Sequence, residues 1–193
     1  VYKRQGAFLS KSISLKIFGD ANDYVAKGLS GGKIVVIPSK NNRLRSKENT
    51  IIGNTVLYGA TSGKLFAAGK AGERFAVRNS GGTAIIEGCD SNGCEYMTGG
   101  TVIILGSVGD NFGAGMTGGM AFIYDPENVF ENFVNPASVT WQKPETKYWK
   151  EKLKFLLEEH LDQTSSTLAK KIIDDFKNEV NNFKQVCPLE MLD

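Results

Sequence analysis

The sequence predicts a mainly β fold, a parallel β-helix with about 19 residues per coil and a C-terminal α-helical hairpin. Five glycine-rich turns are each followed at once by a short apolar strand. The last glycines of these turns are separated by 31, 19, 18 and 19 residues. A turn at a fixed phase of such a repeat is typical of a stacked solenoid. These structural turn glycines are Gly32, Gly63, Gly82, Gly100 and Gly119.

The one long interval contains an insertion. Residues 38–49 (PSKNNRLRSKEN) have no strand pattern, and without these twelve residues the interval of 31 becomes 19. The insertion is basic, so it is either a solvated loop at the edge of a coil or a contact with an acidic partner surface. Its charged residues are Lys40, Arg43, Arg45, Lys47 and Glu48.

Glycine recurs at the coil corners, where we expect a positive φ that penalises any Cβ. Residues 13–18 (ISLKIF) are expected to begin the stack. Between the corners, alternate apolar residues of successive strands are expected to form columns inside the coil. These columns contain Ile34 and Val36, Ala84 and Ile86, Val102 and Ile104, and Ala121 and Ile123.

The chain divides where its glycines end, because all 22 lie at or before Gly119. We assign 1–125 to a glycine-rich β-helix domain, 126–144 to an extended linker with three prolines, and 145–193 to a helical tail packed on the coil. In the tail, one apolar stripe contains Trp149, Leu153, Leu156, Leu157 and Leu161. A second contains Leu168, Ile172, Ile173, Phe176, Val180 and Phe183, and residues 162–166 (DQTSS) end the first helix and cap the second.

The bulk properties exclude several classes of protein. A net charge of +2 gives no reason to expect a nucleic-acid partner, and no run of 18 apolar residues predicts a membrane span. No charged and then apolar segment opens the chain, so nothing indicates secretion. Three cysteines without a disulfide framework suit a reducing compartment, and with a single histidine they predict no metal site.

Two glycine motifs resemble nucleotide-binding loops. Residues 113–118 match G-x-G-x-x-G, but a strand follows where the dinucleotide site needs a helix N-terminus. Residues 59–64 (GATSGK) have three residues between the glycines, whereas a phosphate loop has four. We interpret both as solenoid corners and predict no cofactor-binding residue.

Polar residues near the corners form no readable catalytic constellation. We expect the carboxylates to hydrogen-bond corner amides, although a pair at a suitable separation could cleave sugars. We expect asparagines at the turns, arginines that point away from the core, and His160 in the last turn of a helix. The carboxylates are Asp20, Asp23, Glu73, Glu87, Asp90, Glu95 and Asp110; the asparagines are Asn22, Asn54, Asn92 and Asn111; the arginines are Arg74 and Arg78. We predict no catalytic residue among them.

Three segments carry a family resemblance. Residues 19–36, 51–82 and 92–125 closely resemble the C-terminal, GXGXG-type β-helix domain of the glutamate synthase large subunit. The segments LLEEHLDQTSSTLAKKIIDDF and FKQVCPLEML resemble the end of the same subunit. The resemblance implies a right-handed β-helix that supports the catalytic domains structurally.

The resemblance also implies what the whole enzyme does. Glutamate synthase hydrolyses glutamine in an amidotransferase domain that begins with a cysteine and channels the ammonia to a synthase domain. There 2-oxoglutarate becomes glutamate on FMN, with electrons from a 3Fe–4S cluster. The implied partners are these two domains of the same subunit and, through the full enzyme, a small electron-transfer subunit or ferredoxin. The implied location is the cytoplasm or a plastid stroma.

None of that chemistry maps onto this chain. It begins Val1-Tyr2, and Cys89 and Cys94 do not have the spacing of the cluster ligands. We therefore expect a non-catalytic segment of an oxidoreductase. The alternatives are a stand-alone β-helix subunit, as in archaeal-type glutamate synthases or formylmethanofuran dehydrogenases, and a carbohydrate-active β-helix enzyme.

Overall fold

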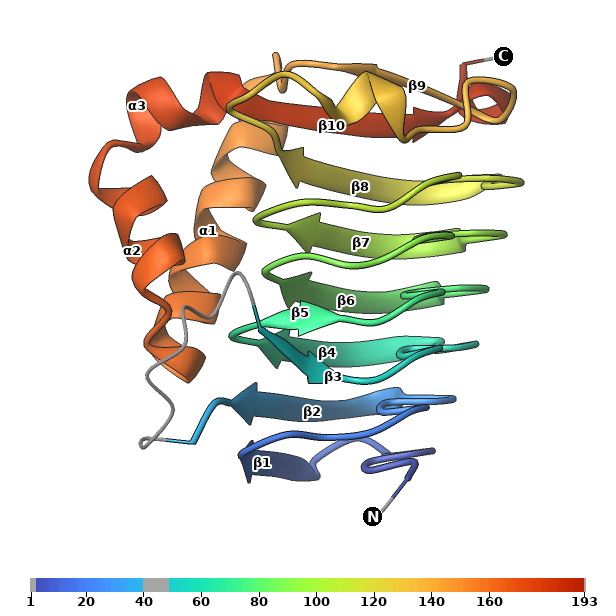
Figure 1. Cartoon of the computed structure of the whole chain (residues 1–193), viewed down its shortest axis with the longest axis vertical. Helices are drawn as coiled ribbons and strands as arrows, with labels where there is room; N and C mark the ends of the chain where they lie inside the picture. The colour runs from blue at the N-terminus through green and yellow to red at the C-terminus, as the bar shows by residue number, and fades with distance from the viewer. Residues whose placement is uncertain (1–2, 40–48, 193) are drawn as a thin grey trace.

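The computed structural model shows the chain as a stack of coils with helices along one side (Figure 1). It describes residues 3–39 and 49–192. The charged residues of the basic insertion lie outside these ranges, so its role stays an expectation. The described part is a β-solenoid of about five turns, and the expected fold class is confirmed.

One strand from each coil joins a single eight-stranded sheet in the order β1-β2-β4-β6-β7-β8-β10-β9. Its parallel strands are β1 (Ser14–Phe18), β2 (Ser30–Ile37), β4 (Ser62–Ala67), β6 (Ser80–Ile86), β7 (Thr98–Ile104) and β8 (Gly118–Tyr124). The last two, β10 (Phe183–Pro188) and β9 (Val139–Gln142), are antiparallel to their neighbours. A second, two-stranded sheet pairs β3 (Thr50–Ile52) with β5 (Lys70–Ala71).

The strand register reproduces the glycine spacing. Lys33, Lys64, Thr83, Thr101 and Met120 pair in succession, at intervals of 31, 19, 18 and 19 residues. One coil earlier, Ser14 pairs with Lys33, again at an interval of 19. The 19-residue repeat is therefore confirmed, and β1 begins the stack as expected.

The inner columns are confirmed as well. All eight residues expected inside the coil are at most 2% exposed and belong to one apolar cluster. Parallel stacking places identical positions of successive coils directly above one another, so each coil buries its apolar face against the next.

The outer face of the main sheet is also apolar, and it carries the helices (Figure 1). The alternate strand residues Val35, Phe66, Ile85, Ile103 and Phe122 pack against Leu153, Leu156 and Leu157 of α1 (Lys147–Thr164) and Ala169 and Ile172 of α2 (Thr167–Asp174). Both faces of the sheet are therefore buried. Parallel strands with this environment read as continuous apolar runs, as KIVVI and TVIIL do.

The end of the chain differs from the expected second helix. As expected, the segment before Ser166 ends α1, and the Ser166 side chain caps α2. However, α2 stops at Asp174 and is followed only by the short α3 (Phe176–Glu179) and the 3-10 turn η3 (Val180–Asn182). Phe183, expected on a helix, begins β10 instead. Pairing with β8 gives this segment hydrogen bonds and a buried face that a further helical turn would not.

Residues 126–144 contain two short elements. The 3-10 turn η2 (Phe130–Asn132) is the helical turn expected there, and β9 pairs with β10 above the last coil. A final 3-10 turn, η4 (Leu189–Met191), follows β10. The linker and the tail thus close the C-terminal end of the stack together.

The five turn glycines are of two kinds. Gly63, Gly100 and Gly119 have positive φ (97°, 88° and 84°), but Gly32 and Gly82 do not, so the expected φ holds at only three positions. At Gly82 the reason for glycine is space, because a Cβ would lie 3.0 Å from the Asn79 side-chain oxygen and 3.1 Å from the Ala60 Cβ. At Gly100 both reasons apply, since a Cβ would also clash with the Gly82 carbonyl oxygen.

We predict that Gly100→Ala lowers the free energy of unfolding by about 2–4 kcal/mol, because the clash with a backbone oxygen adds to the cost of a positive φ. Gly59→Ala is the matched control. Gly59 has φ 63°, and a Cβ added there would meet no other part of the chain within 4 Å, so this change should cost only about 1 kcal/mol. Urea unfolding measures the free energy of unfolding of both variants. Equal losses would contradict the clash between a Cβ at position 100 and the Gly82 carbonyl oxygen.

Candidate functional site

The most regular feature outside the sheets is a corner in which every second residue has a positive φ. Within residues 3–39 and 49–192 such a corner occurs six times, each with three left-handed positions that alternate with other residues. We call these segments the left-handed corners. Their positive-φ residues are Arg4, Gly6 and Phe8; Tyr24, Ala26 and Gly28; Thr55, Leu57 and Gly59; Arg74, Ala76 and Arg78; Asn92, Cys94 and Tyr96; and Asn111, Gly113 and Gly115.

Backbone hydrogen bonds connect each inner corner of the described stack to the coils on both sides. In the coil that contains Ala76, the amides of Arg74 and Arg78 donate to Ser91 and Glu95 of the next coil. The amide of Ala76 donates to Val56 of the preceding coil, at 2.9 Å. The neighbouring coils repeat this pattern of two bonds forward and one bond back. The amides at these positions are therefore used within the stack.

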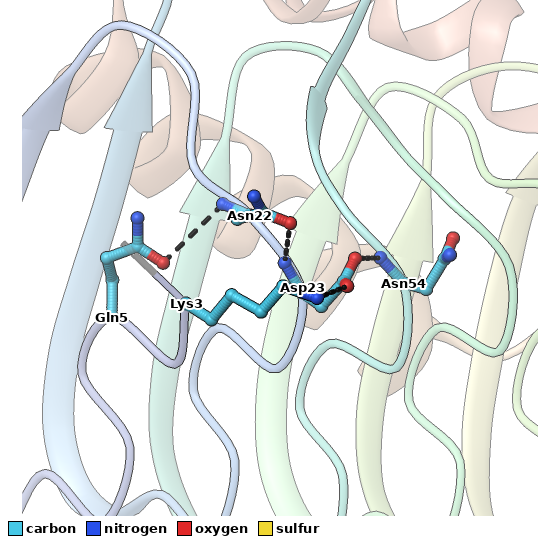
Figure 2. Close-up of polar contacts among 5 residues, drawn as sticks. All are labelled: Lys3, Gln5, Asn22, Asp23 and Asn54. Carbon is cyan, nitrogen blue, oxygen red and sulfur yellow. Dashed lines mark hydrogen bonds and ion pairs between the residues drawn. The ribbon is translucent and has the colours of Figure 1, made fainter. Parts of the chain in front are cut away.

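A column of polar side chains runs along the corners (Figure 2). The Asn22 side chain accepts the amide of Asp23 at 2.8 Å, and Asp23 accepts the amide of Asn54 at 3.0 Å. Asn54 in turn accepts the amide of Glu73 at 2.9 Å. Further along, Asn111 donates its side-chain amide to the oxygen of Asn92 and accepts from Asn135. The expected bonding of asparagines to corner amides therefore holds for Asn22 and Asn54, whereas Asn92 and Asn111 hydrogen-bond through side chains.

Asp23 is the best-connected carboxylate of this column. Its second oxygen lies 3.0 Å from the Lys3 ammonium group, which is largely exposed. The hydrogen bond from the Asn54 amide, assisted by Lys3, lowers the pKa of Asp23 below its ordinary value of 3.8. Both contacts favour the ionised carboxylate, and neither is arranged for proton transfer to a substrate.

The other corner charges are dispersed and lie mostly in contact with solvent. Asp90 lies 3.7 Å from Lys70, and Glu95 lies 3.4 Å from Arg74 of the preceding coil. Arg74 and Arg78 point away from the core, as expected, and within the described ranges Arg78 has no ion pair. Asp20, Glu73 and Asp110 are exposed. No two of these groups form an acid–base pair with a shared, enclosed space.

Glu87 differs from the expected corner carboxylates. It directly follows β6, is fully buried, and lies on the outer face of the sheet beneath the helices. The Ser166 hydroxyl donates to its Oε1 at 2.5 Å, and His160 Nε2 lies 3.9 Å from the same oxygen. His160, expected in the last turn of a helix, lies four residues before the end of α1 and is also fully buried.

These three residue types also occur in hydrolase triads, but the connections differ. A catalytic serine donates to a histidine base, whereas the Ser166 hydroxyl donates to the carboxylate and accepts the Ala169 amide at 3.1 Å. Neither ring nitrogen of His160 has a hydrogen-bond partner within the described residues. With Ser166 only 3% exposed, no substrate can reach the hydroxyl. The cluster joins the helices to the sheet.

The three cysteines are divided between the coil and the closing strand β10. Cys89 and Cys94 are buried inside the coil, and Cys187 lies on β10. Burial raises the pKa of Cys89 to about 12 and that of Cys94 well above its ordinary value, so both are neutral thiols at pH 7. Across residues 3–39 and 49–192 no group of three or more metal-ligating side chains is present.

The two glycine motifs are corners, as interpreted. Gly113 and Gly115 are left-handed positions, and β8 follows them where a nucleotide site needs a helix. Gly59 is another left-handed position, and Gly63 lies at the start of β4. A phosphate would meet no helix N-terminus at either motif.

Hollows on the surface of the described chain include two beside the main sheet. One, of about 380 Å³, lies between the strand starts and α1 and is lined by Thr83, Thr101, Trp149 and Lys152 among others. The other, of about 600 Å³, lies beside the end of β8. There the Tyr124 hydroxyl donates to Glu179 at 2.6 Å, and burial with this carboxylate raises the Tyr124 pKa. Neither hollow contains a nucleophile next to a base.

Asn79, which the sequence did not lead us to single out, is fully buried before β6. Its side chain accepts the amides of Gly81 and Gly82 and donates to the Gly82 carbonyl at 2.9 Å. An asparagine directly before Ser-Gly-Gly is a recognisable turn signal. The sequence contains no comparable signal for the hydrogen bond between Ser166 and Glu87, because the two residues are 79 positions apart.

None of the helices in the described ranges is both long and apolar enough to cross a lipid bilayer.

Comparison with known proteins finds a match to one family model and similarity to several glutamate synthases. The model described as "GXGXG motif" matches residues 3–189. The NADPH glutamate synthase large chain of Azospirillum brasilense is 60% identical over 97% of this chain. The ferredoxin-dependent glutamate synthase of Antithamnion sp. is 48% identical over 95% of this chain. The chloroplastic ferredoxin-dependent glutamate synthase of Spinacia oleracea is 45% identical over 94% of this chain. This chain spans only 11–12% of the length of these three relatives.

We predict that Asp23 contributes to a loss of stability in acid. Because its folded pKa is lowered, its contribution is present above the unfolded pKa of about 3.9 and is lost as pH falls through the folded value. The contribution is below about 1 kcal/mol, since the carboxylate is partly exposed. Urea unfolding between pH 5 and pH 2 should show a flatter pH dependence for Asp23→Asn. An unchanged slope would contradict the assignment.

We further predict that Ser166→Ala lowers the free energy of unfolding by about 2–3 kcal/mol, because it removes a helix cap and a buried partner of Glu87. Thr146→Ala is the matched control, since the Thr146 side chain caps α1 at an exposed position. That change should cost about 1 kcal/mol. Equal losses in urea unfolding would show that the bond to Glu87 contributes nothing.

Proposed function

Since this chain belongs to the GXGXG-motif family, with glutamate synthase large chains as its relatives, we propose that it is the structural β-solenoid domain of such a large chain. The proposed parent enzyme forms two glutamate molecules from glutamine, 2-oxoglutarate and a reductant. In this proposal the domain supports the catalytic domains and contributes no catalytic residue.

One observation carries the structural role. The corner amides of the inner coils bond neighbouring coils, and the buried carboxylate Glu87 accepts a hydrogen bond from Ser166, the cap residue of α2. An active site instead keeps a nucleophile, base or charged group directed at a space where a substrate can lie. The connected backbone of the solenoid suits a rigid support.

We place FMN and the 3Fe–4S cluster of the proposed parent enzyme outside this segment. A cluster of this kind is held by several cysteine thiolates. Two of the three cysteines are buried, protonated thiols in the coil, and the third lies on the closing strand β10. These residues do not fit an iron–sulfur cluster, so no redox step is assigned to them.

The proposed partners are the synthase and amidotransferase domains of the same polypeptide. Electrons would reach the full enzyme through a small electron-transfer subunit or ferredoxin, in keeping with relatives named for NADPH and for ferredoxin. The proposed location is the cytoplasm or a plastid stroma, the latter because some relatives are chloroplastic. A stand-alone subunit is the weaker proposal, since the relatives compared above are far longer chains.

The test is a chimera in which this chain replaces the matching region of the A. brasilense large chain. We predict glutamate synthase activity, and a kcat within about twofold of that chimera for each of Asp20→Asn, Glu73→Gln, Asp90→Asn and Asp110→Asn. Loss of a catalytic acid or base would instead lower kcat by about 10²–10⁴. Gly100→Ala is the control for folding: it should lower the yield of folded chimera without changing kcat per folded molecule. A hundredfold loss from any one carboxylate would overturn the structural role.

A further inference from the structure

A groove lies between α1 and the outer face of the main sheet. It is the hollow of about 380 Å³ described above, and we call it the α1 groove. Its lining comes from the first halves of β6, β7 and β8, from α1 and from the 3-10 turn η4. The side chains that line it include Thr83, Thr101, Met120, Trp149, Lys152 and Met191.

The floor of the groove belongs to one column of side chains on the outer face of the sheet. The column pairs directly from strand to strand and contains Lys33, Lys64, Thr83, Thr101 and Met120. Its members lie two residues before the apolar side chains that α1 and α2 cover, so they point to the same side of the sheet. The threonine hydroxyls can therefore bond the backbone of a segment that enters the groove.

One edge of α1 forms the wall of the groove and runs in step with this column. The helix extends along the stack rather than across it (Figure 1). Its edge contains Tyr148, Lys152, Phe155 and Glu159. The eleven-residue rise along this edge is about 16 Å, and the three strand spacings from Met120 to Lys64 measure about 14 Å. Glu159 meets Lys64 at 2.6 Å, so an ion pair closes one end of the alignment.

Apolar side chains around the groove are uncovered. Tyr148 and Phe155 are 62% and 60% exposed, and Met191 of η4 is 53% exposed. Trp149 is half-buried, with its ring centroid 4.9 Å from that of Tyr148. Single exposed apolar residues are ordinary, but several that gather around one hollow mark an interaction site.

Lys152 brings a positive charge to the groove. Its ammonium group lies 4.9 Å from the ring centroid of Trp149 and 5.7 Å from that of Tyr148. Lys154 of the same helix has a carboxylate one turn away, Glu158 at 3.8 Å, but no acidic residue lies three or four positions from Lys152. Within residues 3–39 and 49–192 Lys152 forms no ion pair. Its charge is available to a carboxylate from elsewhere.

The charges along the column and the helix edge are unbalanced. Three lysines, Lys33, Lys64 and Lys152, stand beside one carboxylate, Glu159, which gives a local charge of 3 − 1 = +2. Complementary charge is the usual arrangement across an interface. The groove therefore suits an acidic segment whose apolar side chains can contact Trp149 and its neighbours.

We propose that the α1 groove is a docking site for an extended segment of the longer polypeptide, with an acidic residue next to apolar ones. The proposal rests on the proposed function, in which this chain is about 12% of a large chain. The acidic residue pairs with Lys152, and the apolar side chains cover Trp149 and Met191. The backbone of the segment bonds the hydroxyls of Thr83 and Thr101.

The size of the groove favours a segment of the same polypeptide over a separate protein. A space of about 380 Å³ holds only a few side chains. Stable contacts between separate proteins bury about 800 Å² on each partner. A segment connected through the polypeptide needs less buried surface, because the connection raises its effective concentration at the groove.

The test is cross-linking of the chimera described above with a carbodiimide, which joins a lysine to a carboxylate in direct contact. We expect Lys152 to be joined to an aspartate or glutamate of the A. brasilense part of the polypeptide. Lys154 is the internal reference, because it does not line the groove and has Glu158 beside it. It should be joined to Glu158 alone.

Thr83→Phe fills the floor of the groove and should lower the yield of the Lys152 cross-link by about tenfold or more, because the ring occupies the space of the segment. Thr140→Phe is the matched control, at a similarly half-buried threonine on β9 outside the groove lining. It should leave the yield unchanged. The Lys154–Glu158 cross-link should persist in both variants, which verifies that α1 is folded.

The outcomes separate this inference from the proposed function. An active chimera in which Lys152 forms no cross-link beyond this segment, or forms one that Thr83→Phe does not reduce, overturns the inference and leaves the proposed function standing. An inactive chimera overturns the proposed function and, with it, the inference. In a mixture of unlabelled and isotope-labelled chimera, cross-links of Lys152 only between the two forms would assign the groove to a second copy. Cross-links only to an added electron-transfer protein would assign it to that protein, and either result would make the inference wrong.

Discussion

The alternating backbone of the left-handed corners is the constraint on which the other parts of the structure depend. Three positive-φ positions per coil would be unfavourable in isolation, and most of them are not glycine. In the inner coils their amides donate to carbonyls of the coils above and below. A corner is therefore stable only as a member of a stack, and stacking fixes the spacing of the parallel strands that follow each corner.

Stacking of the strands creates a second requirement, because it leaves the sheet with two apolar faces. The inner face fills the coil, and the outer face must be covered by something else. The helices α1 and α2 supply that cover, and the buried carboxylate on the outer face, Glu87, is matched by the Ser166 hydroxyl that begins α2. A buried carboxylate in this position disfavours alternative placements of the helices, since any other register would separate it from that hydroxyl.

These requirements explain why no arrangement of side chains typical of a catalytic site is found among the described residues. Polar groups that a catalyst would direct at a substrate are here occupied with neighbouring coils, with helix caps or with solvent. The same connectivity links every inner coil to both of its neighbours, as the proposed supporting role requires.

Periodicity alone determined the solenoid, the 19-residue repeat and the inner columns, because every coil buries the same positions and the glycines mark one phase. The resemblance carried by residues such as 92–125 named the family. The sequence did not predict the alternating positive φ of corners such as 74–78, because this corner contains no glycine. It also did not predict that Gly82 is required by the lack of space for a Cβ. Nor did it determine that Phe183–Pro188 forms a strand and that Glu87 meets Ser166. Those features depend on contacts between residues far apart in the chain, whose free energy outweighs local propensity, so only the tertiary structure decided them.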